Sequence, residues 1–395
     1  MLYAPSENNL WLKQPRTKPE RISDEEINDK YSRGEGRIVI ETNREKLPNF
    51  VSALQKPNYM DLRPFYQRRP RWDRKRQSLL IESFIMNIPV PPVFFYEKEY
   101  NSYEVMDGQQ RITALRDFYN DKFKLEGLSQ WPEINGRTYH SLPDKLRAGL
   151  DRRSITSIVL LKESTADEEE ALSLRETVFE RLNTGGVALS RQEIRNALYQ
   201  SKFNELILRL SQHPTFRAAW EIPYVDTNKI DDFKEEIENP MFKKMEDAEL
   251  VLRFFALRHA EHYQRGMQGF LDMYMYKATY FGDKDISMLE SLFERTIETA
   301  YKIYGSVLFR PYDPINNEWL PKPSKAFYDA VMVGLCDYHD NFDLIKSKKA
   351  GVYENTKKLF EKHEEGTFTG RGNTKNDVQT RINLFRDMLA EVISS

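Results

Sequence analysis

The five residues from Asp107 to Arg111, Asp-Gly-Gln-Gln-Arg, combine side chains that phosphate chemistry uses. A carboxylate can hold Mg²⁺ or polarise a water molecule. A glutamine can orient that water, and an arginine can offset the charge of a transferring phosphoryl group. Gly108 permits a tight turn and a close approach of the backbone. The pentapeptide therefore predicts a phosphate site, and the alternative is an ordinary Asp-Gly turn in which Asp107 caps a helix.

A second candidate stretch, residues 62–76, is basic and contains aromatic side chains. It has seven arginines or lysines against one aspartate, and Phe65, Tyr66 and Trp72 lie among them. Cations contact nucleic-acid phosphates, and aromatic rings stack on bases. The stretch favours DNA contact through these side chains: Arg69, Arg71, Arg74, Lys75 and Arg76. The alternative is a solvated basic loop whose aromatic rings pack inward.

Two stretches that contain glycine follow further along the chain. Gly185 and Gly186 precede residues 190–193, whose Ser-x-x-Glu spacing is that of a capping box. Glycines ahead of a helix can cradle an anion, but a plain connection between two helices needs them as well. Residues 366–376, which include Arg371, could close over a ligand, although their composition favours a surface loop.

The elements that must position these residues follow from hydrophobic periodicity. Alternating and β-branched residues predict strands over 37–42, 89–99, 102–107 and 154–163. Helical spacing covers 43–54, 74–87 and 111–120, and Asp73 can cap the second of these helices. After about residue 165 nearly every periodic segment is helical. We therefore predict an α+β fold in three parts: a flexible arm over 1–35, an α+β nucleotide-binding domain over 36–165 and an α-helical domain over 166–395.

In this arrangement a strand that ends at Met106 delivers Asp107 to the edge of a sheet. A helix that starts near Gln110 then points its free N–H groups at the turn. Strand, turn and helix together place a carboxylate, backbone donors and a cation around one point.

Composition and charge limit the class of protein. The 395 residues carry a formal net charge of −2, so contact with DNA must come from a local patch. The single cysteine, Cys336, excludes a disulfide framework and an all-cysteine zinc site. The six histidines form no metalloprotease or Cys/His pattern. The first residues lack the apolar core of a signal peptide and no uncharged run is long enough to cross a bilayer, so we expect a cytoplasmic protein without membrane contact.

The candidate stretches, taken in order, resemble the ParB-like NTPase domain of GmrSD-type modification-dependent restriction proteins and related phage-defence proteins. The hallmark of that domain, DGQQR, is matched completely by residues 107–111. Residues 87–92, NIPVPP, match a second family element. Two further elements match through these residues: Tyr66, Gln67, Arg68 and Trp72 upstream, and Phe179, Asn183, Gly186 and Leu189 downstream. The resemblance covers roughly residues 36–200.

The resemblance implies a fold similar to ParB and sulfiredoxin, with Mg²⁺-dependent hydrolysis of a nucleoside triphosphate, GTP among the candidates. It assigns catalysis to Asp107, Gln109, Gln110 and Arg111, with Asp107 as the metal ligand. It assigns nucleotide binding to a larger set: Tyr66, Gln67, Arg68, Trp72, Gly108, Thr113, Asn183, Gly185 and Gly186. Sulfiredoxin chemistry is not expected, because the one cysteine lies far outside the resembling region.

In the restriction members of the family, nucleotide hydrolysis is coupled to DNA cleavage by a nuclease domain, commonly of the HNH type. The C-terminal half of this chain has no such signature, and the histidine of His213-Pro214 is not a convincing one. The resemblance therefore predicts an NTP-hydrolysing component of a restriction or anti-phage system, with its nuclease in another chain. The alternatives are a nucleotide-gated DNA-binding module or a helical adaptor, both without turnover. The nucleotide, the DNA modification, the partner nuclease and the oligomeric state stay open.

Overall fold

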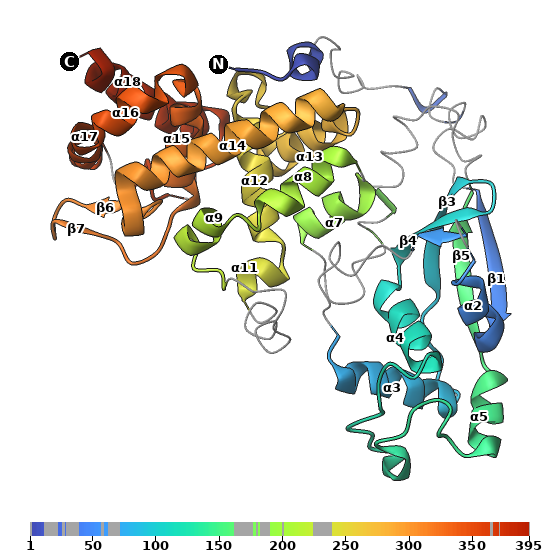
Figure 1. The fold of residues 1–395 in the computed structure, drawn as a ribbon. Coiled ribbons are helices and arrows are strands. Elements are labelled where there is room, and N and C mark those ends of the chain that lie inside the picture. Colours follow the sequence, from blue (N-terminus) through green and yellow to red (C-terminus); the bar gives the residue numbers. More distant parts are fainter. Residues whose placement is uncertain are drawn as a thin grey trace. The chain divides into compact units, whose positions relative to one another are not determined.

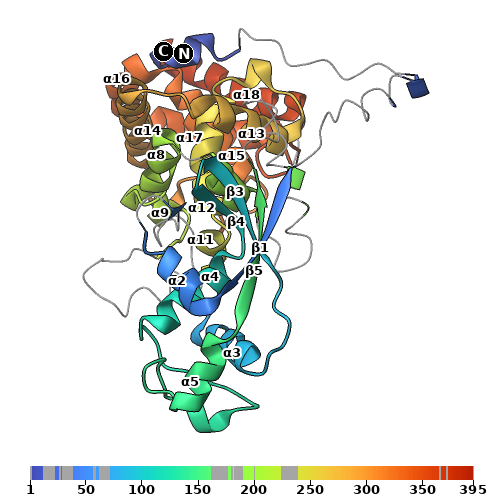
Figure 2. The ribbon, with the colours of Figure 1, turned by 90° about the vertical axis from the view of Figure 1, so that its right-hand side faces the viewer.

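The structure is a computed structural model, and it describes residues 2–11, 23–25, 28, 39–56, 59–61, 72–161, 177–178, 181, 190–199, 201–223, 239–363, 366–370 and 372–394. The chain groups into two compact units. Residues 17–189 form the sheet unit, and residues 1–16 with 190–395 form the helical unit. Figure 1 labels the elements of both units, and Figure 2 draws them from a second side.

A five-stranded mixed sheet organises the sheet unit, and its strand order is β1-β5-β3-β4-β2. Strand β3 lies at its centre, antiparallel to β4 and parallel to β5. The outer strands are β1, antiparallel to β5, and β2, parallel to β4. The bounds are β1 Ile40–Lys46, β2 Met60–Asp61, β3 Val93–Glu99, β4 Ser102–Asp107 and β5 Ser154–Leu160. The strand predicted over 102–107 is confirmed, and the strands predicted over 37–42, 89–99 and 154–163 are present with shifted bounds. The two-residue strand β2 was not predicted, and the α+β class is confirmed.

Among the described residues, the sheet is accompanied by the helices α2 Leu47–Ala53, α3 Arg74–Ile85, α4 Gln109–Tyr119 and α5 Asp144–Asp151. Asp73 accepts a hydrogen bond from the backbone N–H of Arg76 at 2.8 Å, so its predicted role as the cap of α3 is confirmed. The helix predicted over 43–54 starts later, because β1 continues to Lys46 and Pro48 suits only the first turn of α2. Phe95 of β3 and Phe118 of α4 are buried in one core with α3, which fixes the sheet against the helices.

The helical unit confirms the predicted helical C-terminal region. Its helices are α7 Arg191–Leu198, α8 Lys202–Leu210, α9 Pro214–Ala219, α11 Pro240–Lys243, α12 Glu246–Leu257, α13 Gly266–Ala278, α14 Asp283–Tyr304, α15 Lys325–Cys336, α16 Phe342–Ser347, α17 Lys349–Lys362 and α18 Lys375–Ser394. A short hairpin, β6 Tyr312–Asp313 and β7 Glu318–Trp319, joins α14 to α15. The predicted capping box opens α7, where Ser190 Oγ accepts from the N–H of Glu193 at 3.2 Å and the Ser190 N–H donates to Glu193 Oε2 at 2.7 Å.

The first residues of the chain belong to the helical unit, which corrects the predicted arm over 1–35 as far as residues 2–11 are concerned. A short 3-10 helix, η1 Pro5–Asn9, buries Glu7. Arg258 donates to both carboxylate oxygens of Glu7, at 3.1 and 2.9 Å, and Tyr274 donates at 2.6 Å. His259 Nε2 lies 3.1 Å from the same carboxylate. The composition of this segment predicted exposure, but buried partners more than 250 residues away hold it in place.

Contacts on both sides of Glu7 extend this attachment. Ser6 donates to the carboxylate of Asp285 through its N–H, at 2.9 Å, and through its hydroxyl, at 2.8 Å. The ammonium of Lys277 donates to the carbonyl of Leu10 at 2.7 Å. Trp11 stacks on His262, with ring centroids 5.0 Å apart. Residues 2–11 are therefore an integral part of the helical unit, and the sheet unit is an insertion between its two segments.

The grouping by contacts divides the chain after Leu189, whereas the sequence placed the division near residue 165. Residues 162–176 and 182–189, which cover the two boundaries, lie outside the described part of the chain.

Cys336 is buried as a free thiol, and burial raises its pKa to about 11. Within the described ranges, no helix combines the length and the apolar composition that crossing a membrane would need.

The stability of the helical unit should fall in acid. Burial alone would raise the pKa of Glu7, but Arg258, His259 and Tyr274 outweigh it and lower that pKa from 4.5 to about 2. Burial lowers the pKa of His259 below its usual value of 6.5. Both groups bind protons more readily in the unfolded chain, so their stabilising contributions exist at neutral pH and are lost as the pH falls.

We therefore expect the free energy of unfolding to decline below about pH 6.5 and most steeply between pH 4.5 and 2, where Glu7 accounts for about 3 kcal/mol. Thermal denaturation followed by helical circular dichroism between pH 7 and pH 3 measures this. Glu7→Gln is the control, because it should flatten the dependence below pH 4.5. A wild-type profile that stays flat or rises toward acid would contradict the assignment.

Candidate functional site

The predicted pentapeptide forms the junction between β4 and α4, as Figure 1 shows. Asp107 is the last residue of β4 and lies opposite Phe94 of β3. Gly108 is the N-cap residue of α4, with φ at 96°, and the helix starts at Gln109. Because glycine has no side chain, the N–H groups in the first turn of this helix receive no side-chain cap from the N-cap residue. The strand–turn–helix prediction is thus confirmed, and the first N–H groups of α4, which have no partner within the helix, face the turn.

Glycine is required at position 108 for two separate reasons. Its φ lies in the left-handed region, which other residues adopt only with strain. A Cβ atom there would come within 2.9 Å of Val93 Cβ and 3.3 Å of a guanidinium nitrogen of Arg111. Val93 is a buried core residue at the start of β3 and cannot move aside at low cost. The turn is thus closely packed against the sheet.

Gly108→Ala should therefore lower the free energy of unfolding of the sheet unit by about 2 to 4 kcal/mol, combining backbone strain with overpacking. Hydrogen exchange of the β3 and β4 amides, or a urea titration of the whole protein, measures the loss. Gly136→Ala is a matched control, because Gly136 also has a positive φ, 82°, but a Cβ atom there would meet open space. Equal losses in the two variants would show that packing against Val93 contributes nothing.

Asp107 and Arg111 form an ion pair along the start of α4. Arg111 Nη2 donates to Asp107 Oδ2 at 2.6 Å, and Arg111 Nη1 donates to the carbonyl of Pro91 at 2.6 Å. The side chain of Arg111 is 11% exposed and that of Asp107 is 34% exposed. The Asp107 carboxylate thus pairs with the guanidinium of Arg111 instead of capping the helix, and it is still accessible to solvent.

The two glutamines differ in their surroundings. Gln109 is buried, and its Oε1 atom has no hydrogen-bond partner among the described residues. A buried amide oxygen without a partner is costly and is expected to bind a donor such as a water molecule. Gln110 is half-buried at the second position of α4, and Thr113 is half-buried one turn further on. Gln109 therefore has a buried amide acceptor without a partner among the described residues, two residues after Asp107 in the chain.

The other predicted residues are only partly described. Trp72 is half-buried and packs against the hydrophobic core, which favours its structural role over base stacking. Arg74, Lys75 and Arg76 are exposed in the first turn of α3. Arg74 donates to Gln77 Oε1 at 2.8 Å and lies over the ring of Phe123. The remaining candidates lie outside the described residues and stay predictions: Tyr66, Gln67, Arg68, Arg69, Arg71, Asn183, Gly185 and Gly186.

Two contributors to the site were not predicted. Val93 fills the space above Gly108, and the Pro91 carbonyl anchors Arg111. Both belong to or follow the NIPVPP segment, which the resemblance matched without giving it a role. The three prolines of this segment could have indicated such a role, because a proline-rich segment has few N–H donors and its carbonyls are free to accept hydrogen bonds from side chains.

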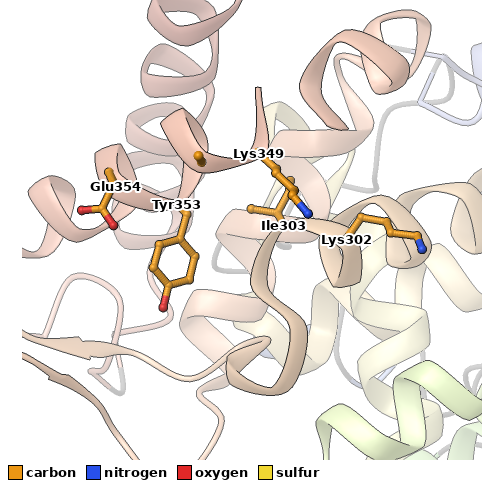
Figure 3. A pocket seen from close by; sticks show the side chains of 6 residues that line it. Lys302, Ile303, Lys349, Tyr353 and Glu354 are labelled. Atoms are coloured by element: carbon orange, nitrogen blue, oxygen red, sulfur yellow. The ribbon is translucent and has the colours of Figure 1, made fainter. Parts of the chain in front are cut away.

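Other features of the described residues do not compete as sites for the predicted chemistry. No group of three or more His, Cys, Asp or Glu side chains within the described ranges could hold a metal ion. A pocket of about 210 Å³ between α14 and α17 is lined by Lys302, Ile303, Lys349, Ala350, Tyr353 and Glu354, and Figure 3 shows these side chains. It contains none of the predicted site residues.

The fold and the turn define an α+β domain whose central strands lead a carboxylate to the start of a helix, followed in the chain by a helical region. Residues 50–200 match the family of the GmrSD restriction endonuclease N-terminal domain, and this part of the chain is similar to that domain. No curated protein and no solved structure matches the chain. The match confirms the predicted resemblance to GmrSD-type restriction proteins over this part of the chain, and it supports a place in a restriction or defence system.

Proposed function

We propose that the sheet unit binds a nucleoside triphosphate at the Asp107–Arg111 turn and hydrolyses it with Mg²⁺, as the nucleotide-handling component of its restriction system. One observation carries the proposal. The start of α4 presents uncapped N–H groups beside a half-buried carboxylate and a buried glutamine with an unmet acceptor. Backbone donors at a helix start favour phosphate groups, and the carboxylate and the amide oxygen suit a metal-bound phosphate and a water molecule.

Each residue then has a defined task. The N–H groups of Gln109 and Gln110 bind phosphate oxygens. Asp107 holds Mg²⁺, and one carboxylate fits this ion because Mg²⁺ in nucleotide sites takes one or two carboxylates together with substrate phosphates and waters. The ion, when bound, offsets phosphate charge and polarises the attacked phosphorus. Gln109 would accept a hydrogen bond from the attacking water through its free Oε1, and Gln110 would hold phosphate or water.

The proposal extends to DNA and to a partner nuclease. The exposed cations at the start of α3 support DNA contact, since a row of arginine and lysine side chains suits phosphate groups without reading sequence. The helical unit has no recognised nuclease signature in its sequence, so the cleavage step belongs to another chain. Nucleotide turnover in the sheet unit would then control that nuclease.

A second candidate is a nucleotide-gated module that binds without turnover. The observation that favours it is the ion pair, which commits Arg111 to Asp107 instead of to a phosphate. In this case the nucleotide changes the conformation of the protein, and a partner uses that change.

Release of inorganic phosphate from each of the four ribonucleoside triphosphates tests the proposal, with and without Mg²⁺ and DNA. Magnesium-dependent release that Asp107→Asn removes is the expected result. Nucleotide binding without release, also in the presence of DNA, would favour the gated module. Absence of any nucleotide binding would contradict both candidates and leave a helical adaptor.

A further inference from the structure

Arg111 is held on two sides by short hydrogen bonds. One guanidinium nitrogen donates to Asp107 Oδ2 and the other donates to the Pro91 carbonyl, both at 2.6 Å. A planar guanidinium that donates in two directions has its orientation fixed. Its side chain is also nearly buried, and Arg111 Nη2 and the Val93 side chain both lie against Gly108. Arg111 therefore occupies a built position within the fold.

The second anchor is itself stiff. Pro89, Pro91 and Pro92 fix three φ angles within four residues, which leaves this segment few conformations. Asn87, just before it, has a φ of 59°, and the N–H of Ile88 donates to the Ser83 carbonyl at the end of α3 at 2.8 Å. The carbonyl that receives Arg111 is thus tied to α3 through a short, rigid turn. Asp107 is connected to that turn through the guanidinium.

A residue that clamps a phosphate must have free donors directed at the ligand. Here the ion pair engages only one oxygen of Asp107, and the other oxygen has no partner among the described residues. The arrangement therefore leaves the carboxylate accessible and engages the arginine. An arginine that clamps phosphate would have free donors, whereas here its donors are engaged. An arginine that orients a metal-binding carboxylate would be bound to that carboxylate, as Arg111 is.

We propose that Arg111 is a positioning residue: it holds Asp107 in the orientation that presents its free oxygen to the nucleotide-bound metal, and it links Asp107 to the turn over residues 87–92. The catalytic part of this inference rests on the proposed function. The structural part, the energetic coupling of Arg111 with Asp107, does not depend on any nucleotide.

The test combines kinetics, nucleotide affinity and stability in Arg111→Gln, Arg111→Lys, Asp107→Asn and the double variant Arg111→Gln/Asp107→Asn. Arg116→Gln is the matched control, because Arg116 lies on the same helix and pairs with Asp117 outside the turn. Affinity is measured for a non-hydrolysable triphosphate analogue with Mg²⁺. Stability is measured as the melting temperature of each full-length variant.

If Arg111 positions Asp107, Arg111→Gln lowers kcat about 100-fold and changes the affinity for the analogue less than about threefold. The double variant is then no slower than the slower single variant, because the two residues act as a unit. Arg111→Lys recovers part of kcat, since lysine keeps the charge but lacks the second direction of donation. A loss of affinity of about tenfold or more in Arg111→Gln, adding to that of Asp107→Asn, would overturn the inference in favour of a phosphate clamp.

The melting temperatures decide the structural part even if the protein turns over no nucleotide. If Arg111 positions Asp107, the drop in melting temperature of the double variant is smaller than the sum of the drops of the two single variants. The reason is that each single variant already removes the same ion pair. Strictly additive losses would overturn the coupling of Arg111 with Asp107. Absence of nucleotide binding in the wild type, combined with non-additive melting, would contradict the proposed function and leave the coupling intact.

Discussion

Replacing Glu7 by glutamine is expected to lower the free energy of unfolding of the helical unit by about 3 to 5 kcal/mol. The carboxylate of Glu7 is fully buried and neutralises Arg258, which is fully buried as well. Glutamine would leave this guanidinium without its counter-ion, and it would direct an amide N–H₂ group at donors. Removing one partner of a buried pair costs much more than the pair itself contributes, because the remaining charge stays out of water.

Hydrogen exchange of amides in α12 and α13 gives the most direct measurement, since Arg258 and Tyr274 belong to or adjoin these helices. Urea denaturation followed by helical circular dichroism gives the overall loss. Glu261→Gln is the control, because Glu261 is about half exposed and its carboxylate makes only long contacts among the described residues, with Tyr3 at 3.4 Å and with His262 at 3.7 Å. That variant should change stability by less than about 1 kcal/mol. A similarly small effect of Glu7→Gln would mean that Arg258 is compensated by other groups.

The role of Glu7 illustrates what local sequence could not indicate. Residues 1–35 are polar and contain proline, and such a composition is typical of a flexible segment. The partner that buries Glu7 is 251 residues away, and no pattern in the first ten residues refers to it. In contrast, the capping residues Asp73 and Ser190 were predictable because their acceptors and donors lie three residues away.

The candidate site was predictable to a different degree. The apolar strand, the Asp-Gly turn and the helical spacing after it are local signals, and the structure confirms all three. Only one of the two hydrogen-bond partners of Arg111 could be predicted from the sequence. Its pairing with Asp107 follows an i, i+4 spacing that the sequence contains, although an arginine in this motif is equally suited to a phosphate contact. Its bond with Pro91 joins two segments across the sheet edge and requires the tertiary structure.

The family match and the structural units do not have the same limits. The match extends to residue 200 and so includes α7, which belongs to the helical unit. Arg195 fixes α7 there, because its buried guanidinium donates to Asp272 Oδ1 at 2.7 Å and to Glu249 Oε2 at 3.0 Å. The family domain therefore reaches beyond the sheet unit by one helix.

Asp107→Asn is expected to reduce phosphate release by a factor of about 100 to 1,000 while the protein stays folded. The variant keeps the shape of the side chain and an oxygen that can accept from Arg111, so the turn is retained. The side chain is one-third exposed, and the loss of its ion pair should cost no more than about 1 kcal/mol of stability. What disappears is the negative charge that would hold Mg²⁺ against the phosphates.

Asp117→Asn provides the matched control for this prediction. Asp117 lies on the same helix and also pairs with an arginine, Arg116, but it is two turns beyond the start of the helix. Its loss should leave phosphate release within about twofold of the wild type, because it removes the same charge at a greater distance from the turn. Circular dichroism and melting temperature confirm folding in both variants. Release that persists in Asp107→Asn at the wild-type rate would remove the turn from the catalytic machinery, and the chemistry would then have to be sought among residues outside it.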